Sequence, residues 1–111
     1  MMKREEIEKM PAGREMDALI AEKVMGWNTK TTPHMNPSFS TVSGVAIQIV
    51  EKMIEYEKFM NGADQIIITR SGDRTKWYVE FRKPNWEYAE DASLALSICR
   101  AALLAVCDET H

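Results

Sequence analysis

The side chains of this chain best suited to chemistry are aromatic and basic, and most of them gather between positions 65 and 88. Between Gln65 and Lys83 the basic residues are Arg70, Arg74, Lys76, Arg82 and Lys83, and the acids are only Asp73 and Glu80. The aromatic rings are Trp77, Tyr78, Trp86 and Tyr88, with Trp27 earlier in the chain. Rings stack on planar groups and guanidinium groups pair with phosphate oxygens. This combination predicts a site for an anionic ligand of nucleotide size.

A second candidate binding region is the segment from Asn28 to Phe39, which contains two prolines and shows no apolar period. It predicts a long loop, and long loops in small domains often bind ligands. His34 is its titratable group. No cysteine, second histidine or carboxylate stands at metal-ligand spacing from it, so we predict neither a metal site nor a cofactor.

Catalytic motifs do not stand out from the background. The chain has no nucleophile elbow, no glycine-rich phosphate loop and no paired zinc ligands. Solvated charge or helix capping explains the carboxylates of residues 5–8 and 90–91, and Cys99 is expected to be a small buried hydrophobe. We therefore disfavour an enzyme, with cleavage of a nucleotide kept as the catalytic alternative.

Length and charge narrow the classes of partner. A chain of 111 residues supports one domain, and a net charge of −3 gives no basic footprint for duplex nucleic acid or an anionic membrane. No run approaches the about 20 apolar residues of a membrane span. Cys99 and Cys107 lie about 12 Å apart along a predicted helix, beyond disulfide reach, which predicts free thiols in the cytoplasm.

Three amphipathic helices and a hairpin account for the periodic segments. Residues 11–27 form the best-patterned helix, which Gly26 ends. Ser40 is expected to cap a second helix from Thr41 to about residue 59. Residues 65–70 and 75–82 predict an antiparallel hairpin with Trp77, Val79 and Phe81 on one face. Residues 85–90 fit a third strand or a loop, and the pattern leaves both open.

The last predicted helix ends near Val106 and is apolar nearly all round. Such a helix is either central in the domain or shared with another subunit. The first helix also has a narrow face of small or flexible residues, Ala18, Ala21 and Met25, where a second element can approach closely. We expect a homo-oligomer that uses the last helix or this small-residue face. The expected domain spans residues 11–106, after a charged segment of residues 1–10 and before a frayed tail of residues 107–111.

Several segments together resemble the phage ABA sandwich domain family. They are PAGREMDALIAEKVMGW at residues 11–27, FSTVSGVAIQIVEKM at 39–53, WYVEF at 77–81 and SICRAALLAV at 97–106. The resemblance implies a three-layer α/β/α sandwich of the α+β class, with helices on both faces of a small, mainly antiparallel sheet. It also implies a phage or prophage source, without an agreed activity.

The phage resemblance and the aromatic and basic residues together lead to one functional hypothesis. We expect a small cytoplasmic protein of infected bacteria that sequesters a nucleotide-derived immune signal of the host. The alternative is a protein-interaction module that inhibits or adapts a host or phage protein. The residues predicted to bind the ligand are Trp27, His34, Ser40, Thr41, Arg70, Lys76, Trp77, Arg82 and Trp86.

Overall fold

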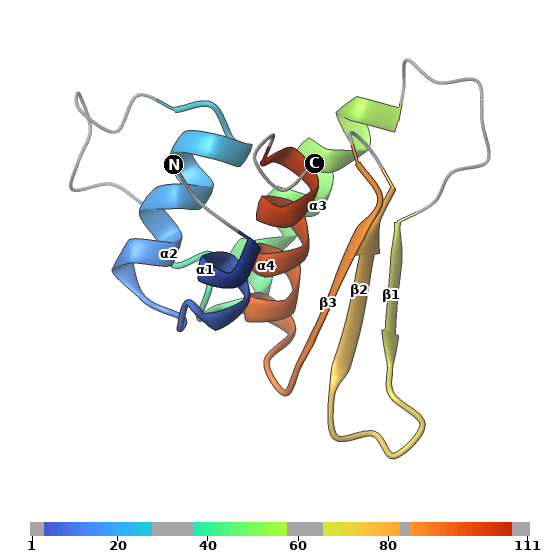
Figure 1. Cartoon of the computed structure of the whole chain (residues 1–111). Helices are drawn as coiled ribbons and strands as arrows, with labels where there is room; N and C mark the ends of the chain where they lie inside the picture. Colours follow the sequence, from blue (N-terminus) through green and yellow to red (C-terminus); the bar gives the residue numbers. More distant parts are fainter. Residues whose placement is uncertain (1–3, 28–36, 58–65, 83–84, 108–111) are drawn as a thin grey trace.

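A computed structural model describes residues 4–27, 37–57, 66–82 and 85–107, with side chains to residue 54 in the second range. Four α-helices, a π-helical turn and three strands follow one another along the chain (Figure 1). In order they are α1 (Arg4–Lys9), α2 (Arg14–Leu19), the π-helical turn η1 (Ile20–Val24), α3 (Ser43–Glu57), β1 (Ile67–Arg70), β2 (Trp77–Phe81), β3 (Glu87–Asp91) and α4 (Leu94–Val106).

The sheet is an antiparallel meander in the order β1, β2, β3. The predicted hairpin is confirmed, because Ile68 pairs with Val79 and Arg70 with Trp77. The third strand that the sequence pattern left open is β3, in which Ala89 pairs with Val79. The α+β class expected from the sequence is therefore confirmed.

Helix α4 lies at the centre of the domain. Ten of its 13 residues are buried, from Ala95 to Cys99 and from Ala101 to Ala105. The helix packs against β2 and β3 on one side and against α1, α3 and η1 on the others (Figure 1). A helix that is apolar all round must be covered all round, and this position achieves that within one chain.

The described part of the chain shows how the helices are arranged around the sheet. Helix α4 occupies the middle, with the sheet on one side and α1, α2 and η1 on the other (Figure 1). The reason lies in the sheet, because only its Val79 and Phe81 side is strongly apolar, and these two residues are fully buried. The other side, which we call the open face, bears residues such as Thr69, Tyr88 and Glu90 that are exposed.

The N-terminal helices differ in detail from the expected pattern. Helix α2 begins at Arg14 rather than Pro11, and it widens into the π-helical turn η1 after Leu19. The predicted end at Gly26 is confirmed by its left-handed φ of 74°. The charged segment before Met10 folds as α1 and places Ile7 fully inside the core.

Candidate functional site

The residues predicted to bind a ligand lie in three different places, and His34 lies outside the described residues. Trp27, Ser40 and Thr41 lie beside α2 and the start of α3, whereas Arg70, Lys76 and Trp77 lie at the β1–β2 hairpin. Arg82 and Trp86 form the third group, on the open face of the sheet. The three groups lie on different parts of the fold and do not form one site.

In the first place, Ser40 has a structural role and does not cap α3, which begins only at Ser43. Its hydroxyl and its backbone N–H donate to Oδ1 of the buried Asp17, at 2.7 and 2.8 Å. The backbone N–H of Gly13 in turn donates to the Ser40 hydroxyl at 2.9 Å. The predicted N-cap was therefore wrong, because the hydroxyl satisfies a buried carboxylate of another helix. Trp27 packs on Phe39 with ring centroids 5.8 Å apart.

In the second place, a cation–π pair joins the two strands of the hairpin. The Arg70 guanidinium lies 4.9 Å from the centroid of the Trp77 ring, and the two residues are register partners. A guanidinium nitrogen of Arg70 also donates to the carbonyl oxygen of Arg74 in the turn, at 2.6 Å. Trp77 shares the inner side of the sheet with Val79, while Lys76 is exposed. These contacts hold the two strands and the turn of the hairpin together.

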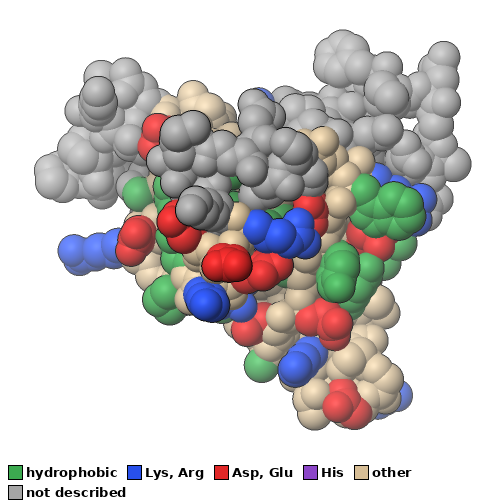
Figure 2. All heavy atoms as spheres, viewed as in Figure 1, with side chains coloured by type: hydrophobic (Ala, Val, Ile, Leu, Met, Phe, Trp, Pro, Cys, Tyr) green, Lys and Arg blue, Asp and Glu red, His purple; other side chains and the backbone are tan. Residues whose placement is uncertain are grey.

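In the third place, aromatic rings cover the open face. The Arg82 guanidinium lies 4.7 Å above the centroid of the Trp86 ring, whose residue is 64% exposed. Beside it, Tyr78 and Tyr88 stack across β2 and β3 with centroids 5.4 Å apart, and Tyr88 is 51% exposed. Figure 2 shows hydrophobic side chains over the strands, next to basic and acidic ones. Exposed stacking surface is therefore concentrated on this face.

A buried carboxylate holds the aromatic surface in place. Glu80 is only 5% exposed although it points to the open face. The Tyr78 hydroxyl donates to its Oε1 at 2.6 Å and Arg82 Nε donates to its Oε2 at 3.0 Å. Burial opposes ionisation, but the hydrogen bonds from Tyr78, Arg82 and Trp86 outweigh it and leave the pKa of Glu80 below its usual value. Desolvation and the bond to Glu80 raise the pKa of Tyr78 to about 12.

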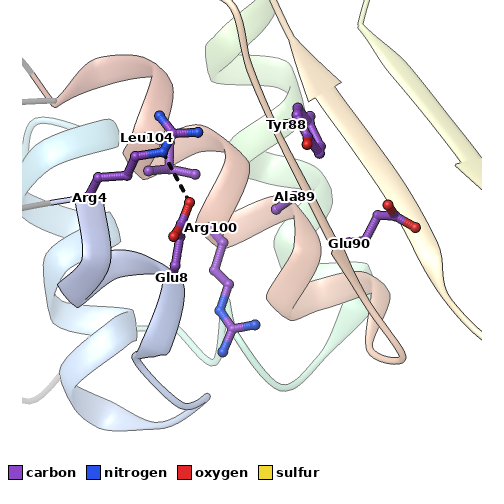
Figure 3. A pocket seen from close by; sticks show the side chains of 7 residues that line it. All are labelled: Arg4, Glu8, Tyr88, Ala89, Glu90, Arg100 and Leu104. Carbon is purple, nitrogen blue, oxygen red and sulfur yellow. Dashed lines mark hydrogen bonds and ion pairs between the residues drawn. The ribbon is translucent and has the colours of Figure 1, made fainter. Parts of the chain in front are cut away.

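A separate hollow, which we call the β3 groove, lies between the outer edge of β3, α1 and α4 (Figure 3). Its cavity volume is about 200 Å³. The lining residues are Arg4 and Glu8 of α1, Tyr88, Ala89 and Glu90 of β3, and Arg100 and Leu104 of α4.

Sequence reasoning missed this groove because its charged residues stand up to 96 positions apart, from Arg4 to Arg100. The one local signal was the spacing of Arg4 and Glu8, which form an i, i+4 ion pair at 3.0 Å. Arg4 also reaches the buried Glu87 at 2.6 Å, and this hydrogen bond raises the pKa of the Arg4 guanidinium above its usual value.

The remaining candidates for reactive chemistry are few in the described part of the chain. No group of three possible metal ligands lies together there. Cys99 and Cys107 are free thiols, as expected. Burial and the nearby Asp17 carboxylate raise the pKa of Cys99 far above its ordinary range, which leaves the thiol protonated and unreactive.

Comparison with known proteins gives the class of this molecule. The sequence profile of the phage ABA sandwich domain matches residues 18–103, and the chain belongs to this family. The fold is similar to the crystal structure of a phage protein from Bacillus cereus ATCC 14579, with a TM-score of 0.64 and 23% identity. That alignment covers 87% of this chain and 93% of the other. No match is found among curated proteins. Among the described helices, none has the length and apolar character needed to span a bilayer.

Proposed function

We propose that this phage-family protein binds a nucleotide-derived immune signal in the cytoplasm of the infected bacterium and sequesters it without cleaving it. The observation that carries the proposal is the exposed Trp86 ring under the Arg82 guanidinium, beside the stacked Tyr78 and Tyr88. The signals we have in mind are cyclic oligonucleotides and the cyclic nucleotide products of TIR-domain enzymes.

Stacking would supply much of the binding energy. A base stacked on an aromatic side chain contributes about 1–3 kcal/mol, and every base offers a flat face for this contact. Trp86 and Tyr88 present two exposed rings on one face of the sheet. A ligand with two linked bases would engage both rings at once, which favours a cyclic dinucleotide over a mononucleotide.

Charge and preorganisation would supply the rest. Glu80 holds Arg82 by its Nε at 3.0 Å, so that the guanidinium is already placed over the Trp86 ring before a ligand arrives. A side chain ordered in advance loses less entropy on binding. The positive charge beside the ring suits a phosphodiester, and Glu80 stays ionised at neutral pH because its pKa is lowered.

Titration calorimetry against cyclic dinucleotides, cyclic trinucleotides and cyclic ADP-ribose isomers tests this function. We expect heat and a thermal shift with at least one compound, and the same compound recovered intact after prolonged incubation. Absence of both heat and shift across the set would overturn the proposal. A cleaved product would instead indicate the nucleotide-cleaving alternative.

A pair of tryptophan variants locates the site. We expect Trp86→Ala to weaken binding at least about tenfold, the loss of one stacked base. Trp27→Ala is the matched control, because Trp27 is also exposed, at 38%, but lies beside η1 and packs on Phe39. If Trp27→Ala alone abolishes binding, the ligand sits at the helical side of the domain.

A protein-interaction module is the second candidate, and the same surface favours it. Exposed tryptophan, tyrosine and arginine are the residues that dominate protein interfaces, and the open face carries all three as Trp86, Tyr88 and Arg82. Helix α4, whose apolar surface would also suit a partner, is covered by the chain itself. A stable partner recovered from infected lysate by the wild-type chain and lost with Trp86→Ala would support this candidate.

A further inference from the structure

We propose that the β3 groove binds an extended, basic peptide segment of a partner protein, which adds to the sheet as a fourth strand along the free edge of β3. This inference does not rest on the nucleotide proposal, because it uses the backbone edge of β3, although Tyr88 and Glu90 belong to both the groove and the open face. It rests on the backbone of β3, the walls of the groove and the charges that line it.

The lining shows which part of β3 points into the groove. Tyr88, Ala89 and Glu90 are consecutive and all three line the cavity. Successive side chains of a strand point to opposite faces, so three in a row share one wall only if the strand presents its edge to it. β3 is the last strand in the order β1, β2, β3 of the described sheet. No other described strand pairs with its outer edge, so we take the edge from Tyr88 to Glu90, which lines the groove, as the part that pairs with the peptide.

The groove has the form that strand addition requires. Helix α1 provides the wall opposite β3 with Arg4 and Glu8, and α4 provides the floor with Leu104 and Arg100 (Figure 3). An extended peptide on this floor would contact β3 on one side and α1 on the other. Main-chain hydrogen bonds to the strand then give affinity, and contacts of alternate side chains give specificity.

One buried donor in the groove lacks a partner among the described residues. Arg100 donates one guanidinium nitrogen to the carbonyl oxygen of Met10 at 2.9 Å and places another 3.4 Å from Asp91 Oδ1. Its Nε is buried without an acceptor. Buried donors in folded proteins are nearly always satisfied. Because this atom has no exposed surface, an acceptor can reach it only if the Arg100 side chain moves, and a carbonyl oxygen of the bound segment would then provide it.

The charges of the groove select a basic occupant. Arg4 is already engaged by Glu8 and Glu87, and Arg100 by Asp91, while the exposed Glu90 adds a further negative charge on the β3 wall. Of the four charged residues that line the groove, two are basic and two are acidic, and the two basic ones already have acidic partners. A lysine or arginine of the partner next to the exposed Glu90 complements the remaining carboxylate.

The same charges argue against a second copy of this chain as the occupant. Pairing two β3 edges would bring together two copies of a strand in which Glu87, Glu90 and Asp91 are acidic. Like charges placed across neighbouring strands are destabilising. The partner is therefore a different, basic segment.

Selection from a display library of short random peptides against the full chain tests the inference. We expect enriched sequences with lysine or arginine at every second position. Failure to enrich any sequence over an unrelated protein, or enrichment of acidic sequences, would overturn it. A chain that dimerises through β3 in solution would overturn it as well.

Backbone methylation of a selected peptide distinguishes strand addition from other modes without altering the protein. Methyl groups on every second nitrogen in the register that faces β3 should weaken binding about tenfold, since each removes a hydrogen bond. Methylation in the other register should have little effect. If methylation in the two registers affects binding equally, the peptide does not pair with the edge of β3.

Two measurements on the protein place the peptide in the groove. Glu90→Gln should weaken binding about two- to fivefold, the effect of one exposed ion pair, whereas Glu51→Gln on the exposed surface of α3 should not. In NMR spectra the Arg100 Nε–H signal should shift downfield as its hydrogen bond forms. An unchanged Arg100 signal with a bound peptide would contradict the assignment.

Discussion

Helix α4 and the open face of the sheet both carry more apolar surface than an ordinary surface element, but they differ in what covers it. The buried residues of α4 are distributed round the helix, and β2, β3, α1, α3 and η1 enclose it. On the open face, Trp86 and Tyr88 remain 64% and 51% exposed. The chain therefore uses the apolar surface of α4 for its own stability, whereas the aromatic surface of the sheet stays exposed and is the surface that we propose for recognition.

A buried carboxylate lies on the helical side of the domain and another on the open face, and the two are satisfied differently. On the helical side, Asp17 accepts from the hydroxyl and the backbone N–H of Ser40, which joins α2 to the segment before α3. On the open face, Glu80 accepts from Tyr78 and Arg82, which are themselves part of the aromatic surface. The first contact holds the fold together, and the second organises a surface.

The largest expected effect is at the centre of α4. Ile98→Ala removes a fully buried side chain and should lower the free energy of unfolding by about 2–5 kcal/mol. Ile54→Ala, at a residue that is 41% exposed on α3, should change it by less than about 0.5 kcal/mol. Urea titration of both variants measures the difference. Similar small losses in both would show that α4 is not the centre of the core.

The second effect is at the buried contact of the helical side. Ser40→Ala removes the hydroxyl that donates to Asp17 and accepts from Gly13, and it should cost about 1–3 kcal/mol because a buried carboxylate loses a donor. Ser38→Ala, at an exposed position two residues earlier, is the control. A loss below about 0.5 kcal/mol for Ser40→Ala, again by urea titration, would contradict the structural role given to Ser40.

On the open face we expect a smaller, pH-dependent effect from Glu80→Gln, of about 1–2 kcal/mol at neutral pH. The folded-state pKa of Glu80 lies below its ordinary value of 4.5, so ionised Glu80 stabilises the folded state. This contribution is complete above pH 4.5 and is lost as the pH falls through the folded-state pKa. Unfolding free energies from pH 7 to pH 3 should therefore converge for wild type and Glu80→Gln.

Glu90→Gln provides the control for that experiment, because Glu90 is exposed on the same face and its replacement should change the free energy of unfolding at neutral pH by less than about 0.5 kcal/mol. A Glu80→Gln difference that stays constant down to pH 3 would show that Glu80 is not preferentially ionised in the folded protein.

The smallest effect on stability is expected from Trp86→Ala. The ring is mostly exposed, and its contact with Arg82 contributes about 0.5–1 kcal/mol at such a site. The free energy of unfolding, measured by urea titration, should fall by no more than this, although the same variant is expected to lose ligand. A loss of several kcal/mol would mean that Trp86 belongs to the core and that the open face is not a surface kept for recognition.

Much of the secondary structure could be predicted from the sequence because the signals are local. The alternation of Trp77, Val79 and Phe81 predicted both β2 and its buried side. Ser93 caps α4 in the usual way for a serine, because its hydroxyl accepts from the N–H of Leu96 at 3.2 Å. The end of the first helix at Gly26 followed from the conformational freedom of glycine. These features depend only on residues that are close together in the sequence.

The candidate site was predicted only in part. Arg82 and Trp86 do come together, and so do Arg70 and Trp77, but on opposite faces of the sheet. Ser40 has the properties of a good N-cap, but its hydroxyl instead donates to the buried Asp17, which lies 23 positions earlier in the chain. Local preference could not reveal this, since the competing partner lies in another helix.

The sequence by itself determined where α3, α4 and the β1–β2 hairpin lie, which face of β2 is buried and that α4 must be covered all round, by this chain or by another subunit. Only the tertiary structure decided that α4 is covered by this chain's own helices and strands, that one face of the sheet stays open, and that Arg4, Arg100 and β3 enclose a groove. The physical reason is the range of the forces involved. Periodicity and capping act over a few residues, whereas the Arg4–Glu87 contact joins residues 83 positions apart and exists only once the elements have packed.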